Sequence, residues 1–457
     1  MNAEPYFMRM PAKEVDVVEP GRRARKDHIA FDLGRDVSFS TAALESFAFA
    51  RWESVTHDAL VAAAAVEYAD KLVKRAPHGW GRRLTLRIPV HDPARWSAPE
   101  VSGALHDALG FLTGDVWAIS FVKRTTPEPD LPLGMLALAV PTQAILAFSG
   151  GMDSRAVAGL IGAKLGEKLV RVRVGTKTSD RPREKGKREP FIAIPYDVSS
   201  DMPNRETSAR TRGFKFAVIS GIAAYLTDAA EIVIPESGQG AIGPALLTVG
   251  HSYPDFRNHP RFTRLMERFL KALLGKDVSY VFPRIWNTKG ETLRAYVAID
   301  STDAWRKTKS CWRNNQWSSV NGKQRQCGVC AACMLRRVSV HAAGLTEPPE
   351  TYICSDMTAP TLEGAVEQGF TKTGGAFRQY ALAGILHMDH LADMASAVQR
   401  SEITRHATTL GPALGLSPQE AGERLITLLN THADEWKSYM NSLGARSFVR
   451  QWARTEQ

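Results

Sequence analysis

From this sequence we expect neither a secretory signal nor a helix that crosses a membrane. Its N-terminal stretch, MNAEPYFMRMPAKEVD, has no apolar core of the kind that a secretory signal requires. Its longest uncharged stretch, residues 131–152, is divided by Gly134 and Pro141, which suits two buried strands better than a helix crossing a bilayer. We therefore expect a cytoplasmic chain that does not bind membranes.

Cysteine is scarce as well, and a strong excess of one charge is absent. Five cysteines, three of them clustered within residues 327–333, argue against a disulfide framework and indicate a metal site in a reducing compartment. Lysine and arginine exceed the acidic residues by 58 to 48, and the net charge of +10 favours an anionic ligand. Because the basic residues are scattered rather than arranged in a stripe, we do not expect nucleic acid as a partner.

The first 140 residues carry no chemical motif that we can name. Residues 41–75 contain long alanine-rich amphipathic segments, and residues 82–90 alternate polar and apolar side chains as a half-buried strand does. A helix is expected at 98–112 and a further strand at 116–124. We predict an N-terminal α+β accessory domain over residues 1–140.

From residue 144 the pattern changes to strand, loop, helix and strand. Buried apolar strands are expected at 144–148, 169–175 and 231–237, with a helix at 155–166. Apolar strands that alternate with helices are typical of an α/β fold with a parallel sheet and helices on both faces. Ligands of such sheets bind beyond the carboxyl ends of the strands. The stretch SGGMDS lies at that position.

SGGMDS has the residue types of a phosphate-binding loop. Gly150 and Gly151 let the backbone approach a phosphate closely, so that several N–H groups can point at it. The helix that follows adds its N-terminal dipole. The hydroxyl groups of Ser149 and Ser154 supply further donors, and Asp153 can hold Mg²⁺ directly or through water. No lysine follows the glycines, so this is not the pattern of P-loop nucleotide hydrolases.

The segment from Ser149 to Ser154 resembles the SGGxDS pyrophosphate loop of the ATP pyrophosphatase, or PP-loop, superfamily. The resemblance implies an adenine nucleotide alpha hydrolase-like core, in an enzyme that cleaves ATP between its α and β phosphates, adenylates an oxygen of its substrate and releases pyrophosphate. Val174 and Gly175, at the end of the second strand, would contact adenine through their backbone. The residues expected at ATP and Mg²⁺ are Ser149, Gly150, Gly151, Met152, Asp153 and Ser154, and those expected to be catalytic are Ser149, Asp153, Ser154 and Lys289.

A second motif is built from cysteine. Cys327, Cys330 and Cys333 follow C-x-x-C-x-x-C spacing, and Cys311 lies upstream as a fourth thiolate. Four thiolates suit tetrahedral zinc in a closed structural site, although an iron–sulfur cluster is held by the same ligands. We predict structural zinc, with Cys354 as an incidental thiol.

The same segment resembles the C…CGxCxxCxxR zinc element of the 7-cyano-7-deazaguanine synthase (QueC) family, with Arg336 in register. Further likenesses lie at 209–224 (ARTRGFKFAVISGIAA), at 252–257 (SYPDFR) and at 284–293 (RIWNTKGETL). The resemblance implies 7-carboxy-7-deazaguanine, a small-molecule substrate with the edge of guanine. Its expected ligands are Arg212, Phe216, Tyr253, Asp255 and Arg257.

The resemblance to QueC covers residues 141–342, which we predict to be the PP-loop domain with its zinc element at 311–333. The segments WGRRLTLRIPVHDPARW and GFLTGDVWAISF make the preceding region look like that of defence-associated QueC-like proteins, the QatC component of the Qat anti-phage system and its counterpart in type IV CBASS. That likeness implies that an amine of a protein partner captures the acyl adenylate. Residues 343–457 are expected to form a mainly helical C-terminal extension.

Several alternatives stay open at this point. A PP-loop enzyme that modifies tRNA would suit the basic balance, and a nucleotide-binding subunit without turnover would suit VGTKTSDRPREK, which departs from the YGQ-type segment of the family. Gly213 also replaces the usual asparagine, and the gap from Cys311 to Cys327 is longer than usual. Ammonia as the acceptor would give an amide and, after a second activation, the nitrile. The sequence does not decide the acceptor or the oligomeric state.

Overall fold

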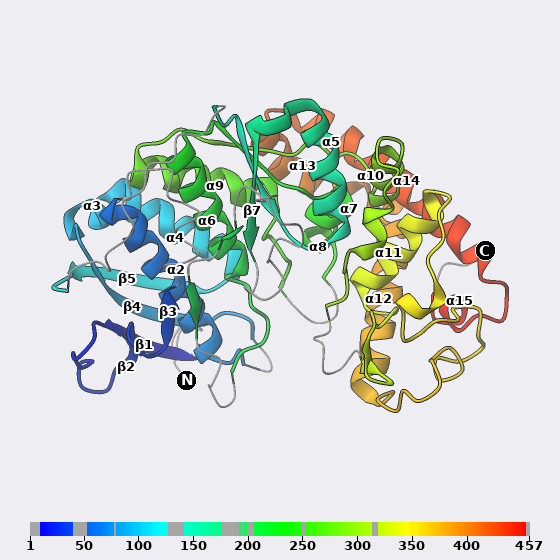
Figure 1. Ribbon diagram of the computed structural model, residues 1–457, viewed down its shortest axis with the longest axis horizontal. Coiled ribbons are helices and arrows are strands. Elements are labelled where there is room, and N and C mark those ends of the chain that lie inside the picture. The colour runs from blue at the N-terminus through cyan, green and yellow to red at the C-terminus, as the bar shows by residue number, and fades with distance from the viewer. Residues whose placement is uncertain are drawn as a thin grey trace, which may run out of the picture. The chain divides into compact units, whose positions relative to one another are not determined.

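The computed structural model divides into two compact units, each assembled from separated stretches of the chain (Figure 1). Unit 1 contains residues 1–149, 165–234 and 255–281, and unit 2 contains residues 150–164, 235–254 and 282–457. The structure describes residues 10–39, 53–76, 79–126, 141–174, 192–193, 196–198, 205–248, 253–312 and 319–453.

Unit 1 begins with a four-stranded sheet in the order β2-β1-β4-β5, in which every neighbouring pair is parallel. Leu84, Leu86 and Ile88 of β4 are fully buried, and helices α2 and α4 contact the strands (Figure 1). The elements are β1 (Ala12–Val18), β2 (Ile29–Asp32), β3 (Val37–Phe39), α2 (Ser54–Leu72), β4 (Arg83–Val90), α3 (Pro93–Ser97), α4 (Pro99–Thr113) and β5 (Val116–Lys123).

The predicted elements of this region are confirmed within the described residues, but the predicted α+β arrangement is wrong. Strand β4 returns to its parallel neighbour β5 through α3 and α4, which is the β-helix-β connection of α/β proteins. The half-buried strand predicted from the alternation in residues 82–90 is confirmed, since Leu84, Leu86 and Ile88 of β4 are fully buried while Thr85 and Arg87 are partly exposed. The parallel direction of β4 does not follow from this alternation, because it depends on the helices that connect β4 to β5.

A second sheet of unit 1 has the order β11-β10-β6-β7-β8, and its neighbouring pairs are parallel. Ile145, Leu146 and Ile232 are fully buried, as their continuous apolar strands require. The α/β class with parallel sheets is thereby confirmed. The elements are β6 (Ala144–Phe148), β7 (Leu169–Val174), β8 (Ile192–Ala193), β9 (Tyr196–Val198), α6 (Arg212–Thr227), β10 (Glu231–Val233), α9 (Pro260–Leu274) and β11 (Ser279–Val281), with a 3₁₀ turn at Gly166–Lys168.

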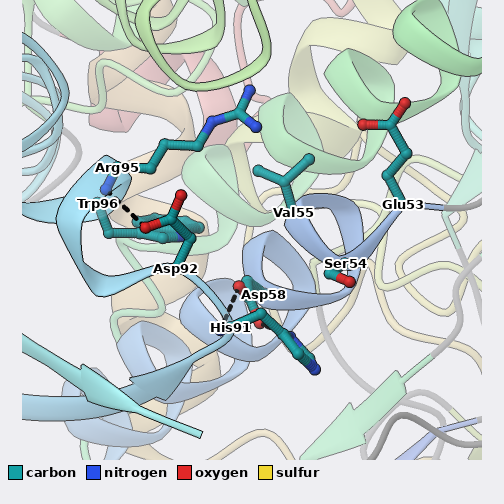
Figure 2. A pocket seen from close by; sticks show the side chains of 8 residues that line it. All are labelled: Glu53, Ser54, Val55, Asp58, His91, Asp92, Arg95 and Trp96. Carbon is teal, nitrogen blue, oxygen red and sulfur yellow. Dashed lines mark hydrogen bonds and ion pairs between the residues drawn. The ribbon is translucent and has the colours of Figure 1, made fainter.

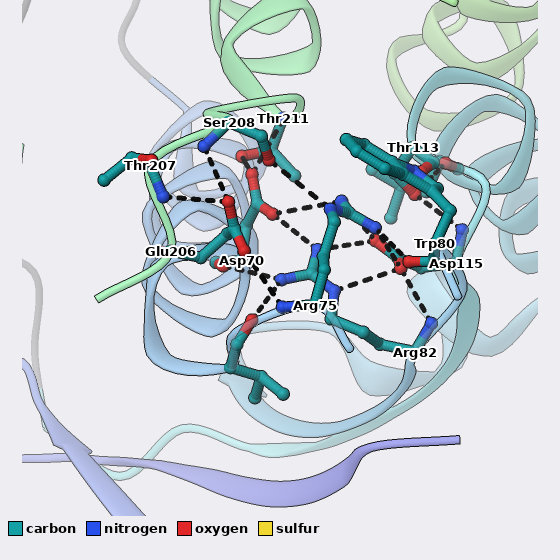
Figure 3. Close-up of polar contacts among 12 residues, drawn as sticks. Asp70, Arg75, Trp80, Arg82, Thr113, Asp115, Glu206, Thr207, Ser208 and Thr211 are labelled. Carbon is teal, nitrogen blue, oxygen red and sulfur yellow. Dashed lines mark hydrogen bonds and ion pairs between the residues drawn. The ribbon is translucent and has the colours of Figure 1, made fainter. Parts of the chain in front are cut away.

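A buried network of charges joins the N-terminal region to the segment that precedes α6 (Figure 3). Arg82 is fully buried and donates to Asp70 and to Asp115, at 2.6 Å in each case. The other oxygen of Asp70 accepts from the backbone N–H and the hydroxyl of Thr211, at 3.0 and 2.8 Å. Arg75 donates to both oxygens of Asp115. The network thus fixes the residue immediately before Arg212.

Unit 2 is mainly helical, and four α-helices between Gly375 and Trp452 lie in the region 343–457, where a mainly helical extension is expected. Phe377 and Ile385 of α12 and Trp436 of α14 belong to a core shared with the cysteine segment. The elements are α5 (Met152–Leu165, whose last residue lies in unit 1), α7 (Gly238–Ala241), α8 (Gly243–Leu246), α10 (Lys289–Val297), β12 (Ser319–Val320), β13 (Lys323–Gln324), α11 (Ala331–Ala342), α12 (Gly375–Asp393), α13 (Arg400–Leu414), α14 (Pro418–Ser442) and α15 (Phe448–Trp452), with 3₁₀ turns at Ala304–Lys307, Pro349–Thr351 and Ala397–Gln399.

Among the described residues, no helix combines the length and apolar character that crossing a bilayer demands. The uncharged stretch 131–152 contains strand β6 and the start of α5, while its residues 131–140 lie outside the described ranges. The boundaries of the three predicted domains, 1–140, 141–342 and 343–457, stay a prediction.

Candidate functional site

The serine-glycine loop connects strand β6 to helix α5, at the carboxyl end of a strand with neighbours on both sides. Ser149 and Gly150 are exposed, and a side chain added at Gly150 would meet nothing within 4 Å. The carbonyl oxygen of Gly150 accepts from the backbone N–H of Lys309, at 2.9 Å. The loop is therefore held from one side and leaves open space beside its backbone, as a phosphate-binding loop needs.

Asp153, in the first turn of α5, is buried and forms an ion pair with Lys289, the first residue of α10. The distance between Oδ2 of Asp153 and Nζ of Lys289 is 2.5 Å. The other carboxylate oxygen, Oδ1, is buried and has no hydrogen-bond partner among the described residues. A buried carboxylate oxygen with its lone pairs unused is a fitting ligand for Mg²⁺, which prefers oxygen.

Helix α10 is held at its start by a capping box and by a carboxyl group from α14. Thr288 accepts from the backbone N–H of Glu291, whose carboxylate accepts in turn from the N–H of Thr288. The hydroxyl of Thr288 donates to Glu435 at 2.6 Å. Burial raises the pKa of Glu435 to about 7. Sequence reasoning missed Glu435, because 147 residues separate it from Thr288.

Four of the predicted substrate ligands lie together in unit 1. The guanidinium of Arg212 lies 5.0 Å from the centre of the Phe216 ring, one turn further along α6. A side chain at Gly213 would overlap Arg257, so this end of α6 packs closely on the Asp255–Arg257 segment. The replacement of asparagine by glycine at this position therefore has a steric reason.

Asp255 already carries charged partners. Arg257 donates from Nε to both carboxylate oxygens, at 3.0 and 2.8 Å, and Arg210 lies 3.6 Å away. Burial raises the pKa of Asp255, but the two guanidinium groups outweigh it and hold that pKa below its usual value. The carboxylate is ionised and is an acceptor for N–H groups.

The other predicted ligands are placed differently. Tyr253 belongs to unit 2, so it is not in the unit that holds Arg212, Phe216, Asp255 and Arg257. Val174 ends strand β7, as predicted, whereas Gly175 lies outside the described residues. The roles of all these residues stay predictions.

Cys311, Cys327, Cys330 and Cys333 converge, with their four sulfur atoms within 4.8 Å of one another. Sγ of Cys327 lies 3.8 Å from Sγ of Cys333. Tetrahedral zinc with bonds of about 2.3 Å separates its sulfur ligands by about 3.8 Å, so the spacing fits zinc. Backbone N–H groups of Cys327 and Cys330 donate to sulfur, at 3.3 Å in both cases, and compensate thiolate charge. Hydrogen bonds from the neighbouring thiols lower the pKa of Cys311.

The surroundings of the four cysteines are fixed by two arginines of α11. Arg336 is fully buried and pairs with Glu347 at 2.7 Å, and it also donates to Thr308, three residues before Cys311. Arg337 donates to the carbonyl oxygens of Gly328 and Cys354. Burial raises the pKa of Cys354 to about 12, so this cysteine is a protonated thiol beside the cluster, in line with its incidental role.

A pocket of about 350 Å³ lies in unit 1, beyond the carboxyl end of β4 (Figure 2). Here Nδ1 of His91 lies 2.7 Å from Asp58, and the ligand atoms of His57, Asp58 and His91 fall within 4.8 Å of one another. Arg124 lies 3.0 Å from Nδ1 of His57, and burial together with Arg124 lowers the pKa of His57 to about 3. Because the arginine donates to that nitrogen and places a positive charge beside the group, we assign no metal there.

Comparison with known proteins places this chain near one family. Residues 217–344 match the family model described as "Queuosine biosynthesis protein QueC". A 7-cyano-7-deazaguanine synthase from Marinomonas sp. (strain MWYL1) is 32% identical over 100 residues, which cover 22% of this chain and 40% of that protein. One from Ruegeria sp. (strain TM1040) is 29% identical over 149 residues, which cover 32% of this chain and 52% of that protein.

The chain therefore contains a QueC family domain and is weakly homologous to 7-cyano-7-deazaguanine synthases, while it spans only about half the length of these relatives or less. The predicted resemblance to QueC is confirmed in this form. The match includes the four cysteines, Asp255, Arg257 and Lys289, whereas the loop at 149–154 precedes it. The likeness to defence-associated proteins stays a prediction.

Proposed function

We propose that this protein is an ATP-dependent ligase of the QueC type that activates the carboxylate of 7-carboxy-7-deazaguanine and transfers the acyl group to a nitrogen acceptor. The observation that carries the proposal is the buried Asp153–Lys289 pair behind the serine-glycine loop. Lys289 lies within the QueC domain and Asp153 in the loop motif, so two separated parts of the sequence meet at one place.

In the first step a carboxylate oxygen of the substrate attacks the α-phosphorus of ATP, and the bond from that phosphorus to the bridging oxygen breaks. Pyrophosphate leaves with the electron pair. The backbone N–H groups of residues 149–151 and the hydroxyls of Ser149 and Ser154 would stabilise the charge that grows on it. Asp153 would hold Mg²⁺, which neutralises phosphate charge, and Lys289 keeps the buried carboxylate compensated.

In the second step the nitrogen acceptor attacks the acyl carbon, AMP leaves, and the nitrogen loses a proton to solvent. A carboxylate is a poor electrophile, whereas its adenylate has AMP as a good leaving group, which is why the first step is needed. The charged Asp255 would accept hydrogen bonds from the N–H groups on the guanine-like edge, and Phe216 would stack on the ring. Zinc held by the four cysteines would be structural.

We further propose that the acceptor is an amine of a partner protein, as in the defence-associated branch, with ammonia as the alternative. The support for this step is that residues 1–140 and 345–457 lie outside both the QueC match, which covers residues 217–344, and the serine-glycine loop. An enzyme that serves only a small acceptor has no need of additional docking surface.

The test incubates the full chain with ATP, Mg²⁺ and 7-carboxy-7-deazaguanine, with ammonium or with proteins encoded nearby, and measures AMP and protein masses. We expect AMP formation that depends on the heterocycle. A mass gain on a neighbouring protein would identify it as the acceptor, and a low-molecular-weight amide would identify ammonia. ATP consumption that needs tRNA instead, or bound nucleotide without turnover, would overturn the proposal.

A further inference from the structure

Gln239 joins the Asp153–Lys289 pair to the C-terminal helix α14. It lies in α7, is almost completely buried, and accepts from the backbone N–H of Lys289 through Oε1, at 2.7 Å. Its Nε2 lies 2.7 Å from Nδ1 of His432 in α14. The Nε2 of His432 lies 2.9 Å from the carbonyl oxygen of Met388 in α12. All of these groups belong to unit 2.

The direction of each hydrogen bond follows from chemistry alone. The backbone N–H of Lys289 is a donor, so the atom of Gln239 that faces it is the oxygen. The amide nitrogen of Gln239 then donates to Nδ1 of His432, which is therefore unprotonated. The carbonyl oxygen of Met388 accepts, so Nε2 of His432 carries the proton. The three hydrogen bonds that join Lys289, Gln239, His432 and Met388 therefore allow one assignment of donors and acceptors, in which His432 is neutral. Burial lowers the pKa of His432 to about 4, in agreement with this neutral form.

Two glycines let Gln239 reach this position. A side chain at Gly238 would overlap the carbonyl oxygen of Ile285 and the side chain of Leu428, so α7 is pressed against both the segment before α10 and helix α14. A side chain at Gly240 would overlap Glu236 and would lie 3.9 Å from Oδ2 of Asp153. The sequence SGQG thus presents one long polar side chain on a backbone that packs closely on three sides.

We infer that Gln239 is a positioning residue: its amide fixes the start of α10, and with it the ammonium group of Lys289 beside Asp153, while His432 fixes the amide. The backbone N–H of Lys289 is one of the donors that the helix itself leaves unsatisfied. Without Gln239 the first turn of α10 loses this anchor and the ammonium shifts relative to the loop. Its effect on turnover rests on the proposed function, whereas its effect on Lys289 does not.

The experiment measures Lys289 directly, in the full chain and without turnover. The lysines are reductively methylated under native conditions, and the rate at each lysine, the buried Lys289 included, is followed by peptide mass spectrometry. We expect Lys289 to react faster in Gln239→Leu than in the parent, because its ion pair with Asp153 is loosened. Lys215, which pairs with Glu67 at 2.8 Å in unit 1, is the internal control and should react at an unchanged rate.

Two variants of His432 separate positioning from packing. His432→Gln keeps one acceptor for the amide of Gln239 and one donor for the carbonyl oxygen of Met388, whereas His432→Leu fills similar space and removes both. We expect His432→Gln to retain the parent rate of Lys289 methylation and His432→Leu to match Gln239→Leu. For AMP formation we expect kcat to fall on the order of tenfold or more in the two leucine variants, with KM for ATP changed far less, because a displaced group acts on the transition state.

Equal methylation rates at Lys289 in the parent and in folded Gln239→Leu would overturn the inference, as would identical behaviour of His432→Gln and His432→Leu. If the parent forms no AMP with the heterocycle, the proposed function fails, and the methylation rates still decide whether Gln239 positions Lys289. Should Gln239→Leu fail to fold, the pair of His432 variants carries the test.

Discussion

At the scale of single residues, the unpaired oxygen of Asp153 is the feature that points to a ligand. A buried polar atom without a partner costs roughly 1–3 kcal/mol, so folded chains rarely retain one without a use. Oδ2 is satisfied by Lys289, while Oδ1 stays unsatisfied among the described residues. A cation or a donor bound at the loop would recover this energy, which couples ligand binding to the geometry of the ion pair.

Asp153→Asn tests that coupling with almost no change in shape. The amide removes the negative charge, leaves the ammonium of Lys289 buried without its partner, and offers a weaker ligand for Mg²⁺. We expect heterocycle-dependent AMP formation to fall by about 10²-fold or more. Asp228→Asn is the control, since its side chain is 93% exposed and pairs with Lys276 at the surface. Parent-like turnover in Asp153→Asn would contradict the role of the loop.

Glu435 predicts a stability that depends on pH. Its pKa is raised from 4.5 to about 7 by burial, so the folded state binds the proton more tightly than the unfolded state does. The resulting stabilisation is fully present below about pH 4.5 and is lost as the pH rises through about 7. Glu435→Gln keeps an oxygen that accepts from Thr288 and removes the titration.

We expect the free energy of unfolding of Glu435→Gln, relative to the parent, to increase between pH 5 and pH 8. The full increase across the titration is on the order of 3 kcal/mol. Denaturant unfolding at both pH values measures it. If the difference in unfolding free energy between the two proteins stays constant with pH, the pKa of Glu435 is not raised in the folded state.

At the scale of elements, the cysteine segment is predicted to need metal for its fold. Three of the four cysteines are fully buried and belong to the same core as α12 and α14. We expect one zinc per chain by elemental analysis. Cys330→Ser should lose the metal and lower the melting temperature, whereas Cys354→Ser should keep the metal. If elemental analysis finds iron and the protein absorbs visible light, the four cysteines hold an iron–sulfur cluster and the zinc prediction is wrong.

The contact between α10 and α14 depends on a glycine. A side chain at Gly290 would approach Oε1 of Glu435 to 2.5 Å and the methyl group of Ala342 to 2.8 Å. Gly290→Ala should therefore destabilise the fold by about 1–3 kcal/mol. Gly103→Ala in α4 is the matched control, because nothing lies within 4 Å of its added methyl group. It should stabilise the chain by up to about 1 kcal/mol, through helix propensity. Denaturant unfolding measures the change in unfolding free energy for each variant and shows whether that change is a loss or a gain.

The elements of this protein were predictable to different degrees, and for physical reasons. The apolar run AILAF and the loop after it are local signals, so the sheet strand and the start of α5 could be read from the sequence. The parallel direction of β4 and β5 could not, because it depends on the helices that cover them. Gln239 could not be found either, since its meaning depends on His432, 193 residues away.

At the scale of the whole molecule, the compact units do not follow the order of the chain. Residues 1–149 fold with 165–234 and 255–281 as unit 1, which contains both the N-terminal sheet and the Arg212–Asp255 cluster. The network of Arg82, Asp70 and Asp115 joins these parts through Thr211. The N-terminal region is therefore built into the unit that carries four of the five predicted substrate ligands, and we expect its stability to affect how those four are held.

Arg82→Leu tests this dependence. The substitution leaves two almost fully buried carboxylates, Asp70 and Asp115, with Arg75 as the one remaining guanidinium among the described residues that pairs with them. Because breaking a buried ion pair leaves an uncompensated charge, we expect a loss of about 3–5 kcal/mol in the free energy of unfolding. Hydrogen exchange should increase around Thr211 as well as in the N-terminal sheet. Arg35→Leu, at a pair whose arginine is 70% exposed, should cost less than about 1 kcal/mol. If exchange increases only in the sheet, the two parts of unit 1 are not coupled through this network.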